Sequence, residues 1–231
     1  NAVCEGEKKV YKGTLGTAIA KFGEISFACT GYNEKTLKDK GIDYVSFYLV
    51  SESHAGYYPN PKELYIKVLG DRNGRILGAQ VIGFEGVDKR IDVFATALYS
   101  GLTFEDLESL DLAYAPPFSS AKDPVIVAGM IGNNIVRKEV SSVDYIPSDA
   151  IVLDVRTKLE NSRAKIESSL NIPIDEIRKR IYEIENIKDK KIIIHCATGH
   201  RSYIVTKMLK NLGYNDVSNL TGGYFFYSKK Y

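Results

Sequence analysis

The stretch Lys191-Ile-Ile-Ile-His-Cys-Ala-Thr-Gly-His-Arg-Ser202 decides the fold of the C-terminal half of the chain. It opens with an apolar run that is typical of a buried parallel strand. A short loop follows, with Cys196 at its start and Gly199 inside it. Apolar residues then recur at helical spacing over 204–212, and Gly213 is a typical C-terminal cap. The pattern predicts a strand, a tight loop and a helix, with one thiol at the start of the loop.

The position of Cys196 predicts a reactive thiol. Backbone N–H groups of a loop that enters a helix carry partial positive charge, so they favour an anion at that place. The thiolate is the nucleophilic form of cysteine, and Arg201 adds a permanent positive charge at the far end of the loop. The alternative interpretation is a buried cysteine that only packs behind the strand. The glycine and the arginine inside the loop favour the reactive thiol.

The pattern Cys-x-x-Gly-x-Arg-Ser after an apolar strand resembles the active-site loop of rhodanese sulfurtransferases. The resemblance implies that Cys196 is the catalytic residue and carries a persulfide. The related loop of tyrosine and dual-specificity phosphatases has five residues between Cys and Arg, whereas this chain has four, which favours a sulfane sulfur over a phosphate. The persulfide loop implied by the resemblance comprises Ala197, Thr198, Gly199, His200, Arg201 and Ser202.

Two further residues match the rhodanese pattern at the end of an earlier strand, Asp154 and Arg156. They are expected to support the loop: Asp154 either orients Arg201 or forms an ordinary ion pair at the end of the strand. His195 is expected to point away from the thiol and His200 toward substrate. The chain departs from the family at 164–169, where Ala-Lys-Ile-Glu-Ser-Ser replaces the usual Gly-His-Ile-x-Gly-Ala.

The composition bounds the class of protein. The chain has 231 residues, enough for two domains, and is 44% hydrophobic with a net charge of +2. Acidic and basic residues are interspersed, so nothing indicates nucleic acid or a membrane surface as a partner. The three cysteines are odd in number and far apart, which favours a reducing cytoplasm. Cys4 lies in a tail, and Cys29 is expected in the core. No metal site is predicted.

The order of predicted elements divides the chain into residues 1–138, a linker at 139–149 and a second domain at 150–231. Antiparallel strands with helices predict an α+β first domain. Alternating strands and helices predict an α/β second domain with a parallel sheet. The first domain is predicted to have strands at 14–21, 24–30, 44–51, 64–69 and 76–83 and helices at 33–40, 88–100 and 124–134. In the second, strands are predicted at 150–156, 170–172 and 217–220, with a helix over 174–184.

The first domain resembles the dimerisation domain of coenzyme A disulfide reductases and related NADH oxidases, which are pyridine nucleotide-disulfide oxidoreductases. Three stretches carry the resemblance: Gly13–Lys21, Gly86–Val93 and Ala113–Pro124. It implies a homodimer formed through residues 1–138, and N-terminal FAD and NADH domains that are missing here. It also implies substrate contacts to coenzyme A from Tyr114 and from one of Tyr57 or Tyr58.

Together the two resemblances imply the C-terminal part of an FAD- and NAD(P)H-dependent reductase of coenzyme A disulfides, persulfides or polysulfides. No cofactor is expected within this chain, and the fragment alone is expected to lack reductase activity. The start Asn1-Ala2 looks like the remnant of a cleaved expression tag. The alternative hypothesis is a non-catalytic dimeric module in which the rhodanese fold serves only as an interaction or sensor domain.

Overall fold

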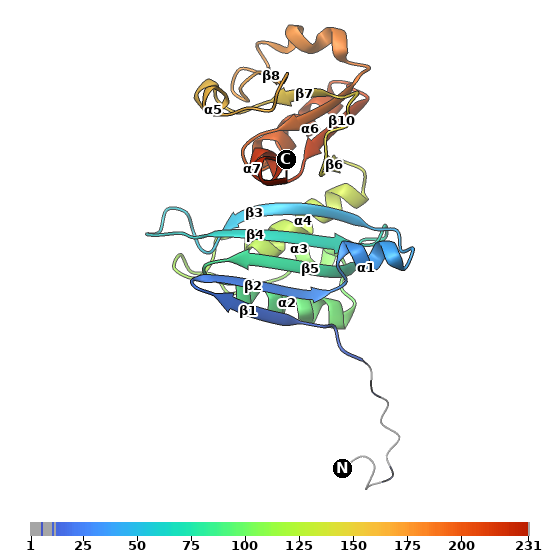
Figure 1. Ribbon diagram of the computed structural model, residues 1–231, viewed down its shortest axis with the longest axis vertical. Coiled ribbons are helices and arrows are strands. Elements are labelled where there is room, and N and C mark those ends of the chain that lie inside the picture. Colours follow the sequence, from blue (N-terminus) through green and yellow to red (C-terminus); the bar gives the residue numbers. More distant parts are fainter. Residues whose placement is uncertain (1–5, 7–10, 12, 231) are drawn as a thin grey trace.

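The computed structural model describes residue 6, residue 11 and residues 13–230 (Figure 1). Asn1-Ala2 and Cys4 lie outside the described residues. The chain forms two domains, and each is built around its own five-stranded sheet. One sheet is antiparallel and the other is parallel, so the predicted fold class of both domains is confirmed.

The first domain consists of an antiparallel sheet and four helices, three of which cover one face of the sheet. The strands are β1 (Ala18–Phe22), β2 (Ile25–Gly31), β3 (Val45–Glu52), β4 (Glu63–Gly70) and β5 (Ile76–Gly83), in the order β1-β2-β5-β4-β3. The helices are α1 (Glu34–Asp39), α2 (Val87–Ser100), α3 (Phe104–Glu108) and α4 (Pro124–Val136). Figure 1 shows α2, α3 and α4 on one face of the sheet, where Phe47, Phe94 and Phe104 form the centre of the core.

Two expectations for the first two strands need correction. The first strand begins only at Ala18, because Gly16 has a φ of 67° and breaks the extended backbone before it. Cys29 is exposed, whereas Ala28 and Thr30 on the opposite face are buried. Alternation shows that side chains divide between two faces but does not show which face is covered. Here α2 covers the face with the smaller residues.

The second domain is a parallel sheet with helices. Its strands are β6 (Ser141–Val143), β7 (Ile151–Asp154), β8 (Leu170–Asn171), β9 (Lys191–His195) and β10 (Asp216–Leu220), in the order β6-β10-β9-β7-β8. Its helices are α5 (Lys158–Arg163), the 3-10 helix η1 (Ile181–Ile187), α6 (His200–Asn211) and α7 (Gly223–Lys230). Strand β6 lies inside the expected linker and pairs in parallel with β10. The linker is therefore also an edge of the second sheet.

The segment expected to be one amphipathic helix over 174–184 is instead a series of turns followed by η1. Ile177 and Ile184 are still buried, so the apolar pattern identified the core positions but not the helix type. Helix α7 was not predicted. It lies between the two domains, where Phe226 stacks on Tyr48 and Phe225 on Tyr65, with ring centroids 4.5 and 4.9 Å apart.

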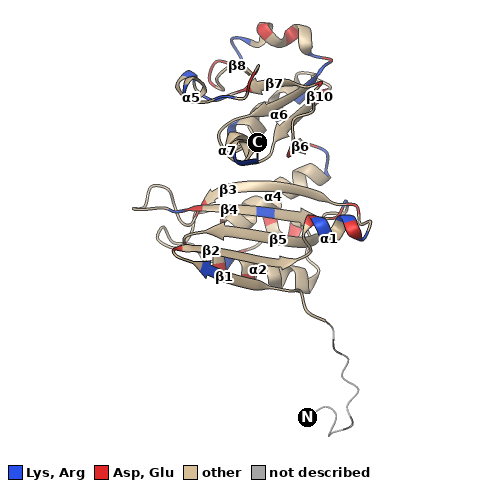
Figure 2. Cartoon of the chain, viewed as in Figure 1, with Lys and Arg blue, Asp and Glu red and all other residues tan. Residues whose placement is uncertain are grey.

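Charge is spread over both domains. Figure 2 shows acidic and basic residues on the same elements, for example on α1 and around η1, rather than on separate faces. None of the helices in the described part of the chain is both long and apolar enough to cross a bilayer.

The loop that departs from the rhodanese pattern contains a strained residue. Ser168 has a φ of 60° and is exposed, at the position where the family pattern places its second glycine. A left-handed backbone costs a residue with a Cβ roughly 1–2 kcal/mol. We expect Ser168→Gly to stabilise the protein by about 1 kcal/mol in urea unfolding. Glu167→Gly, at the exposed neighbour without positive φ, is the control and should not stabilise; equal effects of the two variants would contradict the strain.

Candidate active site

Cys196 follows β9 directly and lies at the bottom of the loop that leads into α6. Its side chain is only 1% exposed. The Gly199 N–H donates to Cys196 Sγ at 3.2 Å, and the Ser202 hydroxyl donates to the same sulfur at 3.5 Å. Gly199 adopts a φ of 99°, which turns the chain into the helix. The sulfur is therefore held by polar donors at the start of a helix, as a thiolate or persulfide requires.

Helix α7 fixes the same loop from its other side. The Tyr224 N–H donates to the Cys196 carbonyl at 2.8 Å, and the Phe225 N–H donates to the Ala197 carbonyl at 2.9 Å. At Gly223 a Cβ would lie 2.6 Å from the Cys196 carbonyl oxygen, so only glycine allows this approach. The Cys196 and Ala197 carbonyls thus point toward α7, and the Gly199 N–H, one peptide unit beyond them, faces the sulfur.

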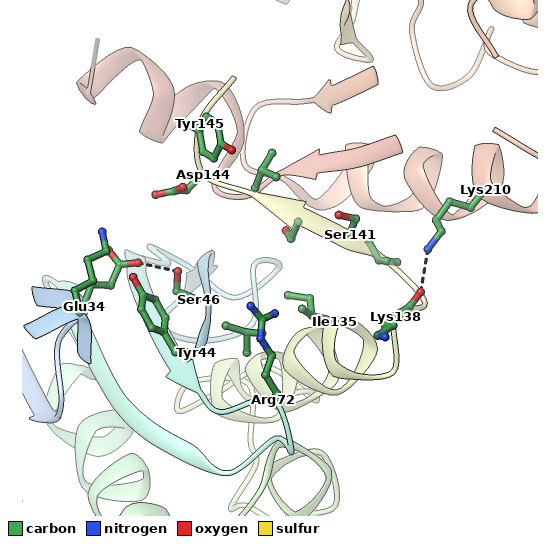
Figure 3. A pocket seen from close by; sticks show the side chains of 15 residues that line it. Glu34, Tyr44, Ser46, Arg72, Ile135, Lys138, Ser141, Asp144, Tyr145 and Lys210 are labelled. Atoms are coloured by element: carbon green, nitrogen blue, oxygen red, sulfur yellow. Dashed lines mark hydrogen bonds between the residues drawn. The ribbon is translucent and has the colours of Figure 1, made fainter. Parts of the chain in front are cut away.

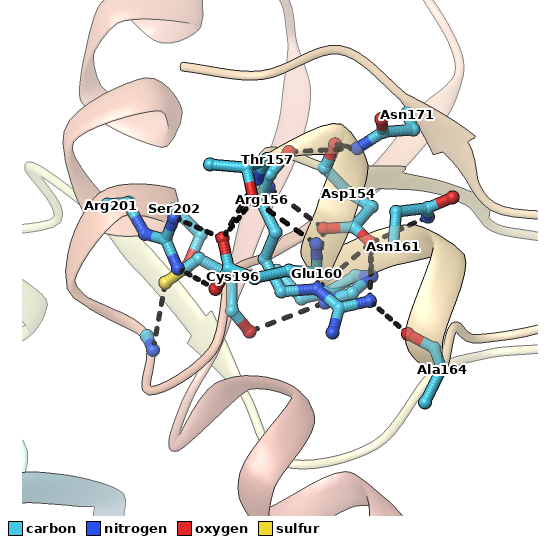
Figure 4. A network of polar contacts seen from close by, with 12 residues as sticks. Asp154, Arg156, Thr157, Glu160, Asn161, Ala164, Asn171, Cys196, Arg201 and Ser202 are labelled. Carbon is cyan, nitrogen blue, oxygen red and sulfur yellow. Dashed lines mark hydrogen bonds and ion pairs between the residues drawn. The ribbon is translucent and has the colours of Figure 1, made fainter. Parts of the chain in front are cut away.

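Arg201 is bound by Glu160 and not by Asp154, which corrects one of the two expected roles of that aspartate. The guanidinium donates two hydrogen bonds to Glu160, at 2.8 and 2.6 Å (Figure 4). The hydrogen bond from Arg201 lowers the pKa of Glu160 to about 2, and the same bond raises the pKa of Arg201. Glu160 was missed in the sequence, although its capping box with Thr157 is a readable signal.

Asp154 forms a buried pair with Arg156, which is the other role expected for it. The distance from Arg156 Nη2 to Asp154 Oδ2 is 2.6 Å, and Asn161 donates to the same carboxylate at 2.9 Å. Burial raises the pKa of Asp154, but these hydrogen bonds more than offset it, so the carboxyl is ionised. Arg156 also donates to the Ala164 carbonyl at 2.8 Å, which ties the unusual 164–169 loop to the strand (Figure 4).

The two histidines that flank the thiol have different environments. His195 is fully buried, and its Nε2 lies 3.7 Å from Asp154 Oδ2. Burial lowers the pKa of His195 to about 4, so the ring is neutral at pH 7. His200 is exposed at the first position of α6. His200 and Thr198 line a cavity between the two domains.

In the first domain, the structure brings Tyr57 and Tyr114 together. Their hydroxyl groups are 2.9 Å apart, and the side chains are 77% and 48% exposed. Tyr58 instead packs edge-on against His54, with ring centroids 5.7 Å apart. Tyr57, and not Tyr58, is therefore the hydrogen-bond partner of Tyr114.

A buried guanidinium joins the two loops that carry these tyrosines. Arg90 Nη2 donates to the Ser53 carbonyl at 2.9 Å, to Ser119 Oγ at 3.3 Å and to Asp123 Oδ2 at 3.0 Å. Ser53 precedes the first tyrosine loop, and Ser119 follows the second. Asp123 also caps α4 through the Val125 N–H. Arg90 therefore acts as a cross-link that holds the two loops at a fixed separation.

One cavity is remote from all of these side chains. It has a volume of about 540 Å³ and lies between the domains near Ser46, Arg72, Lys138 and Lys210 (Figure 3). None of the predicted site residues lines it. Within the described part of the chain, no group of three or more His, Cys, Asp or Glu side chains is arranged to hold a metal ion.

Comparison with known families divides the chain in the same way. Residues 17–125 match the dimerisation domain of pyridine nucleotide-disulphide oxidoreductases, and residues 136–230 match the rhodanese-like domain. The chain thus joins a dimerisation domain of that oxidoreductase family to a rhodanese-like domain, which confirms the resemblance seen in the sequence. The second match begins before the predicted boundary at 150 and includes β6.

Individual proteins are similar to one or both domains. Coenzyme A disulfide reductase of Staphylococcus haemolyticus is 42% identical over 121 residues, which are 52% of this chain and 27% of that protein. The reduced CoADR-RHD of Bacillus anthracis superposes with a TM-score of 0.93 at 43% identity, over 98% of this chain and 42% of that one. An NAD-dependent persulfide reductase from A. fulgidus gives 0.87 at 37% identity, over 97% and 41%. The chain spans about a quarter of the curated relative and about two fifths of each solved chain.

The buried His195 predicts a specific loss of stability in acid. Its folded-state pKa of about 4 lies below the ordinary value of 6.5. As the pH falls from 6.5 toward 4, the unfolded chain binds a proton that the folded protein does not bind. The contribution is therefore complete above pH 6.5, and at pH 5 about 2 kcal/mol of unfolding free energy is lost.

His195→Phe removes this group while keeping a ring of similar size. We expect the unfolding free energy of the variant to fall less than that of the wild type between pH 7 and pH 5, measured by urea unfolding at both values. His54 and His200 are present in both proteins, so their effects cancel in the difference. Parallel pH curves for the two proteins would show that His195 is not held neutral by burial.

Proposed function

We propose that this chain is the C-terminal part of an FAD- and NAD(P)H-dependent reductase of coenzyme A disulfides, persulfides or polysulfides, in which the second domain transfers sulfane sulfur through a persulfide on Cys196. The observation that carries the proposal is the Gly199 N–H at 3.2 Å from Cys196 Sγ, in a loop whose carbonyls are turned toward α7. The similar proteins include a coenzyme A disulfide reductase and a persulfide reductase, which supports the class of substrate.

The transfer takes place in two balanced displacements. The Cys196 thiolate attacks the outer sulfur of a donor persulfide R–S–SH, the donor S–S bond breaks, and R–SH leaves with the proton. An acceptor thiolate then attacks the outer sulfur of the Cys196 persulfide and releases the Cys196 thiolate, so the pair of steps has no net oxidation. The Gly199 N–H and the Ser202 hydroxyl would bind the negative charge on the cysteine sulfur before the first displacement and again as the second releases the thiolate. Glu160 holds the Arg201 guanidinium in one position beside the loop.

The first domain would form the homodimer and complete the substrate site of the partner subunit. No loop after a parallel strand carries a Gly-x-Gly-x-x-Gly sequence, so FAD and NAD(P)H are assigned to upstream domains of the full-length enzyme, where they would supply the reducing electrons. Tyr57 and Tyr114 are the residues that would contact coenzyme A. When one hydroxyl donates to the other, one phenolic proton remains for the substrate.

Sulfur loading tests the role of Cys196. After incubation with thiosulfate, we expect mass spectrometry to find one extra sulfur atom on the peptide that contains Cys196, and no such adduct in Cys196→Ser. Cys29→Ser is the matched control, because Cys29 is exposed on the outer face of the first sheet. That variant should load sulfur as the wild type does.

Sulfur loading and alkylation of Cys196 together distinguish sulfur transfer from the alternative hypothesis. If the second domain is only an interaction or sensor module, Cys196 should react with iodoacetamide no faster than free cysteine and should form no persulfide. An adduct of equal abundance in wild type and Cys196→Ser would place the sulfur elsewhere and defeat the assignment. Hydrolysis of an aryl phosphate that depends on Cys196 would instead support the phosphatase interpretation.

Removing one tyrosine hydroxyl tests the first domain in the full-length flavoenzyme. The hydrogen bond to Tyr57 raises the pKa of Tyr114, so its hydroxyl remains a donor at neutral pH. We expect Tyr57→Phe or Tyr114→Phe to raise KM for coenzyme A disulfide roughly 2- to 10-fold, the effect of one neutral hydrogen bond. Tyr58→Phe is the control and should leave KM unchanged. A larger effect for Tyr58→Phe would show that the wrong tyrosine has been assigned.

A further inference from the structure

A second cavity lies between the two domains at the back of the Cys196 loop. Its volume is about 400 Å³, within the range of sites for small organic molecules. One wall is α4 and β3 of the first domain, with Leu49, Val127 and Ile131. The other wall is the second domain, with the loop residues Thr198–His200 and the end of β10. The cavity is thus built from both domains.

The lining of this cavity excludes charged ligands. No Asp, Glu, Lys or Arg side chain is among the residues that line it. Aliphatic and thioether groups predominate on the α4 side. Burial of an ion without a partner of opposite charge is costly, so the chemistry of the walls selects an uncharged, largely apolar molecule.

One residue that lines the cavity has a buried polar atom without a partner among the described residues. Asn219 is 6% exposed, and among the described residues its Oδ1 accepts no hydrogen bond. Three other polar side chains of the lining have partners: Asn134 Nδ2 donates to the Tyr203 hydroxyl at 2.6 Å, and the Thr221 hydroxyl accepts from the Tyr48 N–H at 2.7 Å. A buried acceptor without a donor is unfavourable and calls for an explanation.

We propose that this cavity is a binding site for an uncharged, largely apolar small molecule that carries one N–H or O–H donor, and that the donor binds Asn219 Oδ1. The occupant would also lie against Gly199, whose N–H binds the Cys196 sulfur. Binding would therefore change the surroundings of the reactive loop, although the ligand would not contact the sulfur itself. The proposal does not depend on the proposed sulfur transfer, because ligand binding to the cavity is measured without any turnover.

Indole and 1-methylindole are matched probes for this site, since both are uncharged aromatic molecules of similar shape and only indole has an N–H. We expect ligand-observed NMR titrations of the whole chain to show indole binding about 5- to 10-fold more tightly than 1-methylindole. In ¹⁵N-labelled protein, indole should shift the amide resonances of Thr198–His200. The amide of Tyr57, in the remote tyrosine loop, should not shift.

Two variants test the two parts of the site. Asn219→Leu removes the acceptor with a side chain of similar size, so the preference for indole over 1-methylindole should disappear. Val127→Trp fills the cavity from α4 and should abolish the binding of both probes while leaving Asn219 intact. Equal binding of the two probes to the wild type would overturn the role of Asn219. Unchanged binding in Val127→Trp would overturn the location.

Discussion

The polar surroundings of the thiol depend on the hydrogen bonds from the start of α7 to the carbonyls of Cys196 and Ala197. The C=O and N–H groups that flank a peptide bond point in opposite directions. Fixing the Cys196 and Ala197 carbonyls toward α7 therefore turns the N–H groups of Ala197 and Thr198 away from that helix, and the next N–H along the loop, that of Gly199, reaches the sulfur. The first residue of α7 is Gly223, and a larger residue at this position would collide with the Cys196 carbonyl. The geometry of the loop is therefore set by α7 as well as by α6.

The same helix also joins the two domains. Within its first turn, Phe225 and Phe226 stack on Tyr65 and Tyr48 of the first sheet. Thr221, just before the helix, exchanges two hydrogen bonds with the backbone of Tyr48 at 2.7 and 3.0 Å. Since one helix holds both the loop and the domain contact, a change that separates the domains also loosens the Cys196 loop. The two domains are thus coupled mechanically at the reactive site.

Local patterns predicted most of the fold and the loop, because strand, turn and capping signals act between residues that are close in the sequence. Three failures arose where distant contacts decide. Cys29 is exposed because α2 covers the other face, which alternation cannot reveal. Helix α7 was missed because its Tyr-Phe-Phe-Tyr run is packed between domains and has no single apolar stripe. The Glu160–Arg201 pair joins residues 41 positions apart, which no motif within one element shows.

The charges around the sulfur explain why the loop amides matter. Arg201 and Arg156 each have a carboxylate partner within hydrogen-bond distance. Each cation is therefore partly neutralised. A negative charge on Cys196 would be bound by the Gly199 N–H and the Ser202 hydroxyl, with Arg201 beside them, whose pKa is raised first by Glu160 and also by Cys196. The field of a dipole falls with distance more steeply than that of a charge, so these donors act only on an atom seated in the loop. The site is accordingly suited to hold one thiolate or persulfide rather than to attract multiply charged anions from a distance.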